Sequence, residues 1–464
     1  MAQSDKVGKF KITVNRDYKI QAEREPKEGD IEDCQISFTN LQWRTVDFLI
    51  DMLRGGRLQS RKELELLGEN LYAILLDNKI GEALYEAIYN SPPQLKYWRV
   101  ELEFKAVLYP FVSWPWEYLY CPFSRQGGGA FLAERTNFVL TRRLTTSRRA
   151  RDLLVPEDQK IRVLFVAPSS EKLPVEYGRV LETLKALEVN SQNRIELTTL
   201  VDDPYSPEED NKYEPQATFS NFFCKVCAID PHVIHFIGHG KSVNNEGGQL
   251  AFLDGREQGK EHWVGEELAP KLAGGTALRL VFLQACESAH PASSYIPYEA
   301  ISGLAMQIAH QNIPAVVGMQ YPINTLVANK FASAFYEALV SFKSIDAAIL
   351  AGRLEILPEI SDWKKSISFG LPVLYLRESG SLIAPQTAQT RTGSTPSAFK
   401  KSAPPPPINV PTEELLCHWC GYRCRPKENF CINGHPLICT RCKTRVDSQR
   451  DHCSHCGRKL IVEQ

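Results

Sequence analysis

Two residues that could carry out nucleophilic catalysis follow apolar runs of the sequence. His239 and Gly240 come directly after "HVIHFIG" at 232–238, and Cys286 comes directly after "LRLVFLQA" at 278–285. A cysteine is a good nucleophile near neutral pH only as its thiolate, and a neighbouring histidine can take the proton. If both runs are neighbouring parallel strands, their carboxyl ends meet at one edge of a sheet. We therefore predict a His239–Cys286 dyad, with the backbone N–H groups of Gly240 and Cys286 as an oxyanion hole.

A group of potential metal ligands lies near the end of the chain. Eight of the 13 cysteines fall between residues 417 and 456, in three Cys-x2-Cys pairs, one Cys-x3-His and the unmatched Cys424. In a reducing compartment such clustering indicates metal binding rather than disulfides. Eight ligands fill two closed tetrahedral zinc sites, and zinc supplies folding energy that so short a segment lacks. The predicted ligands of these two structural zinc ions are Cys417, Cys420, Cys431, His435, Cys439, Cys442, Cys453 and Cys456.

Two pairings of these zinc ligands are open. In sequential pairing the first four ligands bind one zinc and the last four bind the other, as in double zinc ribbons. In interleaved pairing the first and third ligand pairs share one zinc, and the second and fourth pairs share the other. We favour interleaving, because the order of the pairs resembles a RING finger, with "CINGHPLICTRC" as the most similar piece.

The catalytic residues need a rigid frame, and the central part of the chain predicts one. Short apolar runs alternate there with stretches of helical spacing, which is typical of an α/β sandwich with a mainly parallel sheet. One apolar stretch carries Cys224 and Cys227 without a matching pair, and we interpret these cysteines as core packing. The predicted strands are 161–167, 195–201, 232–238, 278–285 and 313–319, and the predicted helices are 176–188 and 324–339; earlier in the chain we expect a helix at 61–76 and a strand at 95–104.

Composition divides the chain into four segments. Residues 379–411 are rich in Ser, Thr and Pro and almost free of large apolar residues, which predicts a disordered linker. Residues 1–155 and 156–378 precede this linker, and a small cysteine-rich module of residues 412–464 follows it. We expect residues 156–378 to be the catalytic domain.

Several stretches of the chain resemble the CHAT-domain proteins, a prokaryote-rich branch of the caspase and separase clan. In chain order they are "PWEYLY", "GGAFLAERTNFVLTRRL", "IRVLFVAPS", "DPHVIHFIGHG", "GGQLAFLDG", "LRLVFLQACESA", "IPAVVGMQYPI" and "FGLPVLYLR". The resemblance covers roughly residues 60 to 378. It implies a caspase-like α/β/α sandwich preceded by a diverged, non-catalytic half, residues 1–155. It also implies cysteine peptidase activity with His239 as base and Cys286 as nucleophile.

Substrate preference is only weakly encoded. Ser288 stands where the caspase signature has glycine, which argues against caspase-like specificity for aspartate. Clan relatives that cut after arginine or lysine use a carboxylate in the primary pocket. Asp254 and Glu287 are the candidates by proximity in sequence, and Gln320 in "MQYP" could line the same pocket.

Charge and hydropathy restrict the compartment and the partners. The net charge is −1, so no strong field favours nucleic acid or a membrane surface. No apolar run approaches the roughly 18 residues of a membrane helix, and the first residues lack a signal-peptide core. We therefore expect a cytoplasmic protein with protein partners.

Two functions are compatible with these motifs. The first is a cytoplasmic caspase-like cysteine endopeptidase whose zinc module recruits substrate or partner, in prokaryotic defence or regulated proteolysis. The alternative is a RING-type ubiquitin-like ligase component or zinc-finger scaffold, in which the CHAT domain is a regulatory or processing module.

Overall fold

A computed structural model gives the arrangement of the chain, which forms two compact units, residues 1–385 and 386–464. The residues that the structure describes are 6–27, 30–58, 60–105, 111–122, 129–144, 150–155, 159–190, 194–202, 217–243, 247–256, 260–286, 299–321, 324–357, 367–377, 380, 382, 415–416 and 423–424.

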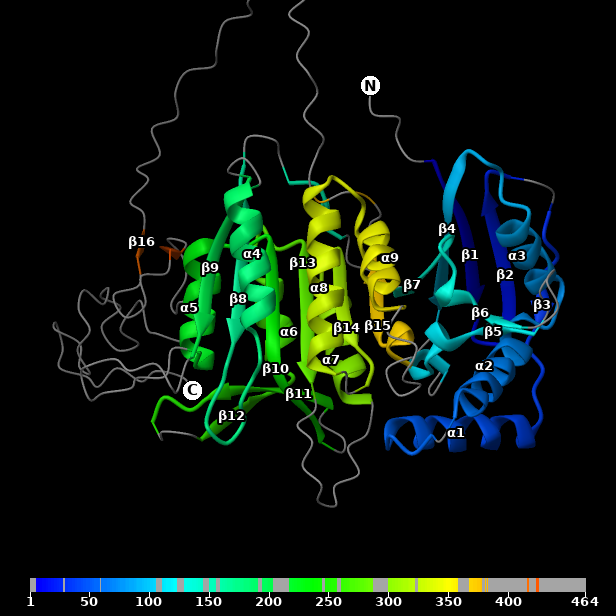
Figure 1. Ribbon diagram of the computed structural model, residues 1–464, viewed down its shortest axis with the longest axis horizontal. Helices are drawn as coiled ribbons and strands as arrows, with labels where there is room; N and C mark the ends of the chain where they lie inside the picture. Colours follow the sequence, from blue (N-terminus) through cyan, green and yellow to red (C-terminus); the bar gives the residue numbers. More distant parts are fainter. Residues whose placement is uncertain are drawn as a thin grey trace, which may run out of the picture. The chain divides into compact units, whose positions relative to one another are not determined.

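Within the described residues, thirteen strands of the first unit form one sheet (Figure 1). Along the sheet the order is β12-β11-β10-β13-β14-β15-β7-β4-β1-β2-β3, with β8 also beside β10 and β9 beside β8. The strands are β1 (Lys6–Val14), β2 (Lys19–Glu25), β3 (Cys34–Gln35), β4 (Leu95–Phe104), β7 (Phe138–Leu144), β8 (Ile161–Ala167), β9 (Ile195–Val201), β10 (Val233–Val243), β11 (Gly247–Leu253), β12 (Glu261–Val264), β13 (Leu280–Cys286), β14 (Ala315–Met319) and β15 (Pro372–Leu376).

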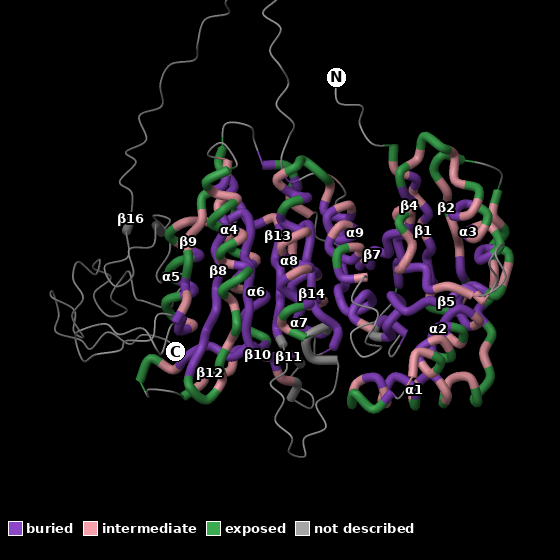
Figure 2. Tube along the Cα trace, viewed as in Figure 1, coloured by how far each residue is buried: buried purple, intermediate pink, exposed green. Residues whose placement is uncertain are grey.

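The centre of this sheet is parallel, which confirms the predicted mixed α/β class with a mainly parallel sheet. Strands β9, β8, β10, β13 and β14 run in the same direction. Strand β15 is antiparallel to β14 and parallel to β7, so it joins the central strands to those of the first 155 residues. Strands β8, β10, β13 and β14 are largely buried on both faces because helices cover both, as Figure 2 shows, whereas β9, which among the described strands pairs with β8 alone, is only partly buried.

The expected end of one strand was wrong. The sequence predicted a strand over 232–238 that stops before His239, but β10 continues to Val243. Beyond His239 the chain leaves its parallel neighbour and pairs antiparallel with β11, from Gly240 opposite Leu250 to Val243 opposite Gly247. Gly240, which was expected to follow the strand, is therefore the first residue of β10 that pairs with β11.

Helices of the central part cover opposite faces of the sheet. Apolar residues of α4, α8 and α9 belong to one hydrophobic core, and those of α5, α6 and α7 belong to a second core. Side-chain caps begin several helices: Thr218 caps α5 and Asn324 caps α8. The helices are α1 (Asn40–Arg54), α2 (Arg61–Leu76), α3 (Lys79–Tyr89), α4 (Gly178–Asn190), α5 (Phe219–Ile229), α6 (Leu268–Ala273), α7 (Glu299–Ala309), α8 (Thr325–Val340) and α9 (Ile345–Ile356).

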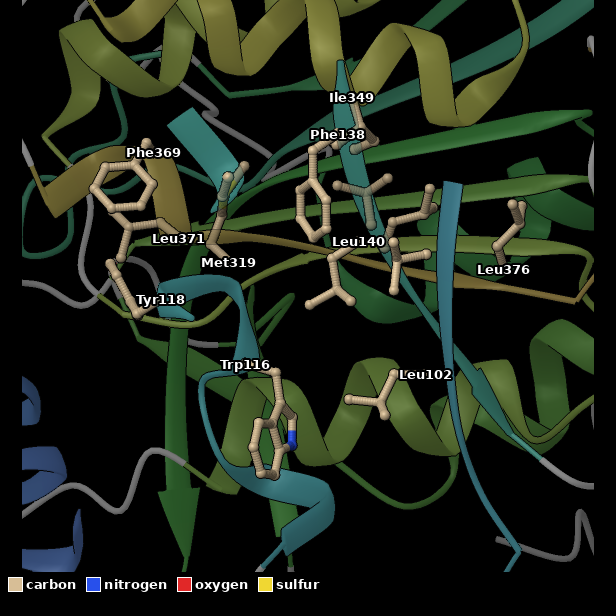
Figure 3. Close-up of a cluster of buried hydrophobic side chains, with 14 of the residues drawn as sticks. Leu102, Trp116, Tyr118, Phe138, Leu140, Met319, Ile349, Phe369, Leu371 and Leu376 are labelled. Atoms are coloured by element: carbon tan, nitrogen blue, oxygen red, sulfur yellow. The ribbon is translucent and has the colours of Figure 1, made fainter. Parts of the chain in front are cut away.

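The proline-interrupted stretch at 111–121 forms a compact connection instead of a long helix or strand. Two 3-10 helices, η1 (Phe111–Ser113) and η2 (Trp116–Tyr118), are followed by β5 (Tyr120–Cys121), which pairs with β6 (Ala130–Phe131). Figure 3 shows Trp116 and Tyr118 of this stretch in one hydrophobic cluster with Met319 and Leu371. The N-terminal residues and the central strands thus share a core.

The second unit is described only at two short strands, β16 (Leu415–Leu416) and β17 (Arg423–Cys424), which pair antiparallel. The eight predicted zinc ligands lie outside the described residues, as does nearly all of the predicted linker. The proposed boundary near residue 155 and the zinc module therefore stay predictions.

Candidate functional site at the carboxyl edge of the sheet

The two predicted catalytic residues are partners in the sheet. Strands β10 and β13 run parallel with an unbroken register, from Val233 opposite Leu280 to His239 opposite Cys286. Neighbouring strands are about 4.8 Å apart, so this register brings the two main chains together at the carboxyl edge. Cys286 is the last residue of its strand, and its side chain lies outside the described residues.

The imidazole of His239 is held from one side by a backbone carbonyl. His239 is 9% exposed, and its Nε2 lies 3.2 Å from the carbonyl oxygen of Pro174. A carbonyl oxygen can only accept, so Nε2 carries the proton in this contact. The lone pair that a general base needs is then on Nδ1.

The loop that carries Pro174 is fastened by two buried serines. This loop follows β8, and Ser169 Oγ accepts a hydrogen bond from the backbone N–H of Val175 at 3.0 Å. Ser170 Oγ accepts from the N–H of Leu173 at 3.0 Å. Because these bonds flank Pro174, they fix the carbonyl that orients His239.

The other sequence-predicted site residues are not all brought together. Gly240 is buried in β10, where it is level with Leu250 of β11. Asp254 follows β11, is half-buried, and accepts a hydrogen bond from the N–H of Arg256 at 2.8 Å. Glu287 lies outside the described residues. Gln320, directly after β14, is 4% exposed, so its side chain points into the protein.

A second histidine on β10 is a core residue and not a candidate base. His235 is fully buried, stacks on Phe282 with ring centroids 4.4 Å apart, and its Nδ1 lies 2.8 Å from Tyr336 Oη. Burial lowers the pKa of His235 to about 3, which keeps this ring neutral at physiological pH. His232, at the other end of the strand, has its pKa lowered to about 4 by burial and by the nearby Arg162.

These neutral histidines predict a loss of stability in mild acid. In the unfolded chain each would titrate near its ordinary pKa of 6.5, whereas the folded values are about 3 and 4. The unfolded state therefore takes up more protons below about pH 6.5, and folding stability falls as the pH drops from there toward 4. The slope is about 1.4 kcal/mol per pH unit for each histidine. Urea unfolding at several pH values measures it.

Between pH 7 and pH 5 the histidines change the folding stability, whereas carboxylates with lowered pKa values change it only in stronger acid. Burial raises the pKa of Asp230, but hydrogen bonds from Ala277 and Thr276 lower it more. The contribution of Asp230 to folding stability is therefore lost only in stronger acid. The matched variant is His232→Asn, which should reduce the slope by about one histidine. A midpoint that stays constant between pH 7 and pH 5 contradicts the prediction.

The interpretation of one cysteine pair was wrong. Cys224 is exposed and Cys227 is half-buried, while Phe222, Phe223 and Val226 are the residues that α5 buries. The two cysteines therefore do not belong to the buried face of α5, although the apolar residues around them had suggested core packing. Among the described residues, no group of three or more His, Cys, Asp or Glu side chains could hold a metal ion.

The chain is similar to a known family of proteins. Residues 66–390, more than half of the chain, match the CHAT domain. The chain therefore belongs to the CHAT-domain family, which confirms the resemblance seen in the sequence. A comparison with curated proteins found no match.

A comparison with solved structures found matches at low sequence identity. The Arg-specific cysteine proteinase gingipain R has 9% identity and a TM-score of 0.41, over 67% of this chain and 69% of the other. The complex of the pro- and mature domains of RgpB from Porphyromonas gingivalis has 10% identity and a TM-score of 0.40, over 74% and 77%. The separase–securin complex of Saccharomyces cerevisiae has 13% identity and a TM-score of 0.32, over 75% of this chain and 23% of the other.

Two parts of the site could not be found from side-chain types. The acceptor for His239 is the main chain of Pro174, and a backbone carbonyl leaves no mark in the sequence. Glu117 and Arg142 form a buried ion pair next to Gln320, and although the motifs "PWEYLY" and "GGAFLAERTNFVLTRRL" contain these residues, nothing in either motif predicts the pairing. In the part of the chain that the structure describes, no helix is long and apolar enough to cross a membrane.

Proposed function

We propose that this protein is a cysteine peptidase in which Cys286 is the nucleophile and His239 is the base. The observation that carries the proposal is the register of β10 and β13, which makes these two residues direct partners at the carboxyl edge of a mainly parallel sheet. Residues at one register position of neighbouring strands share a face of the sheet. Membership of the CHAT-domain family is consistent with this assignment.

The proposed reaction is acyl transfer in two steps. His239 Nδ1 takes the thiol proton, and the thiolate of Cys286 attacks the scissile carbonyl carbon to form a tetrahedral oxyanion. The C–N bond then breaks, and the protonated His239 gives its proton to the leaving amine. In the second step His239 deprotonates a water molecule, which cleaves the thioester and releases the acid. The N–H groups of Gly240 and Cys286 are the proposed donors to the oxyanion.

The hydrogen bond to Pro174 supports this role for His239. A proton held on Nε2 by the carbonyl oxygen keeps the ring in the tautomer that has a basic Nδ1. The same carbonyl stabilises the imidazolium ion that forms when Nδ1 is protonated. This arrangement orients the ring through a main-chain carbonyl.

The proposal is tested by labelling with a library of peptidyl acyloxymethyl ketones that differ in the first residue. We expect covalent attachment at Cys286, located by mass spectrometry of the digested protein, with a rate that depends on the peptide. The exposed Cys224 is the chain's own control, because it is accessible but has no assigned base. Labelling confined to Cys224 would contradict the proposed nucleophile.

We further propose that residues 412–464 bind two zinc ions and recruit a protein partner or substrate. The support is the spacing of the eight ligands, which suits two closed tetrahedral sites. Such a module would serve regulated proteolysis by bringing a target to the peptidase.

We expect two zinc ions per full-length chain and none in a chain truncated after residue 385, where the first compact unit ends. Metal analysis of both proteins checks this. A chelator should unfold the second unit and leave peptide cleavage by the first unit unchanged, because metal binding supplies the folding energy of such modules. Zinc in the truncated protein would show that the ligands are assigned wrongly.

A further inference from the structure

The side of the proposed site away from His239 is formed by the end of β14. Strands β13 and β14 are parallel, with Leu283 opposite Gly318. Counting two residues on from this last pair gives Ala285 in β13 and Gln320 directly after β14, so Gln320 comes one residue before the level of Cys286. Whatever fixes the main chain at Gln320 therefore sets one wall of the proposed site.

Gln320 is fixed by both its main chain and its side chain. Its N–H donates to the carbonyl oxygen of Leu371 at 2.8 Å. Its side-chain Nε2 donates to Glu117 Oε2 at 2.7 Å and to the carbonyl oxygen of Gly370 at 2.7 Å. Its Oε1 accepts from Arg142 Nη2 at 3.2 Å. The whole amide is thus satisfied inside the protein.

Two of the three partners of this amide, Glu117 and Arg142, belong to the N-terminal part of the chain. Glu117 is 1% exposed and Arg142 is 2% exposed, and the two form a bidentate ion pair at 3.0 and 2.5 Å. Arg142 also donates to the carbonyl oxygens of Val112 and Trp114 at 3.1 and 2.9 Å. The charged pair is therefore anchored to the stretch at 111–121 and to β7.

Apolar contacts around the pair come from the same two parts of the chain. Figure 3 shows Trp116, Tyr118, Met319 and Phe369 in one cluster, and the rings of Tyr118 and Phe369 meet edge to face with centroids 5.4 Å apart. These apolar contacts would hold the N-terminal and central parts of the chain together even without the polar bonds. The buried amide and ion pair add directional bonds, which fix one arrangement more narrowly than apolar packing does.

We infer that Glu117 and Gln320 are positioning residues that hold the end of β14 at the distance from Cys286 that peptide binding requires. The inference rests on the proposed peptidase function and goes beyond it. It assigns to the N-terminal part of the chain a role in substrate binding, although that part supplies neither His239 nor Cys286. Neither Glu117 nor Gln320 contacts the reacting atoms in this assignment.

The test separates peptide handling from the reactivity of Cys286. In full-length protein that carries Cys224→Ser, Gln320→Met fills the same space without the bonds to Glu117, Arg142 and Gly370. We expect its kcat/KM for a peptide substrate to fall at least about tenfold, mainly through KM, because a binding wall has moved. The rate of alkylation of Cys286 by iodoacetamide, which uses no peptide contacts, should stay within about twofold of the parent.

A second variant keeps the inference testable if the first one folds poorly. Gln320→Glu places two carboxyl groups side by side, faced by the buried cations Arg142 and Arg353. Two such carboxyl groups can share one proton in mild acid but repel each other when both are charged. We expect its KM relative to the parent to rise as the pH increases from 5.5 to 8. If Gln320 has only a structural role, the variant should lose thermal stability but its KM relative to the parent should not change with pH.

Tyr97→Phe is the matched control, because it removes a buried polar contact elsewhere, the hydrogen bond to Asp346 at 2.9 Å. It should lower stability and leave KM unchanged. The inference is overturned if Gln320→Met leaves KM at the parent value, or if peptide cleavage and alkylation fall together. If the parent itself neither cleaves peptides nor reacts at Cys286, the proposed function fails and this inference fails with it.

Discussion

Cys286→Ala is expected to abolish peptide cleavage while the protein remains folded. The thiolate is the nucleophile in the proposed reaction, and alanine has no group that can attack a carbonyl carbon. The change removes one sulfur atom at the end of β13, so the sheet register from Leu280 onward should persist. Release of a fluorogenic peptide product measures the activity, and the urea midpoint measures the fold.

His239→Ala is expected to lower kcat/KM at least about 10²-fold, the usual effect of removing a general base. The matched control on the same strand is His235→Phe, because His235 is buried against Phe282 and Tyr336 and has no part in the chemistry. That control should lose stability but keep a measurable rate. If His239→Ala cleaves peptides as fast as the parent, the dyad is wrong.

Glu117→Ala is expected to have the largest effect on stability, about 3–5 kcal/mol. It leaves the guanidinium of Arg142 buried without its carboxylate partner, and Arg142 is only 2% exposed. Arg353, fully buried nearby, has its pKa lowered to about 10 by burial, and the charge of Glu117 opposes that shift. Removing Glu117 therefore leaves two buried cations without their nearest anion. Equilibrium unfolding in urea gives the free energy.

The control for this variant is a solvent-exposed ion pair. Lys79 and Glu82 are 2.9 Å apart on the exposed surface of α3. Lys79→Ala should change the free energy of unfolding by at most about 1 kcal/mol. Similar losses for Glu117→Ala and Lys79→Ala would show that the buried pair is not a structural link. The double variant Glu117→Leu/Arg142→Met should be less destabilised than Glu117→Ala alone, because only Arg353, instead of two buried cations, is then left without Glu117.

Most central strands could be predicted because burial on both faces makes them continuous apolar runs; β9 was predicted as a buried strand too, but it is only partly buried. The predicted strands at 161–167 and 195–201 have the bounds of β8 and β9. The pairing of strands could not be derived in the same way, because it depends on residues far apart in the chain. The extension of β10 was missed for this reason: Lys241 to Val243 are in a strand only because β11 pairs with them.

The candidate site shows the same division. His239 and Cys286 could be chosen from residue type and from their places after apolar runs, and their register then agrees with the expectation of neighbouring parallel strands. Gln320 was chosen as a pocket residue from its place after a strand. The direction of its side chain depends on Glu117, which is 203 positions away in the sequence. No local sequence pattern predicts the hydrogen bond between Gln320 and Glu117.

The pairing of β15 with β7 has a practical consequence for dividing this protein into pieces. A strand with an unpaired edge offers its N–H and C=O groups to other chains, and such edges promote aggregation. A recombinant fragment that begins near residue 156 would lack β7, so Tyr375 would lose its partner Arg142 and the edge of β15 would be open to solvent. Such a fragment should associate or precipitate, and its inactivity would say nothing about His239 or Cys286. Functional studies therefore require the whole sheet, from β1 to β15.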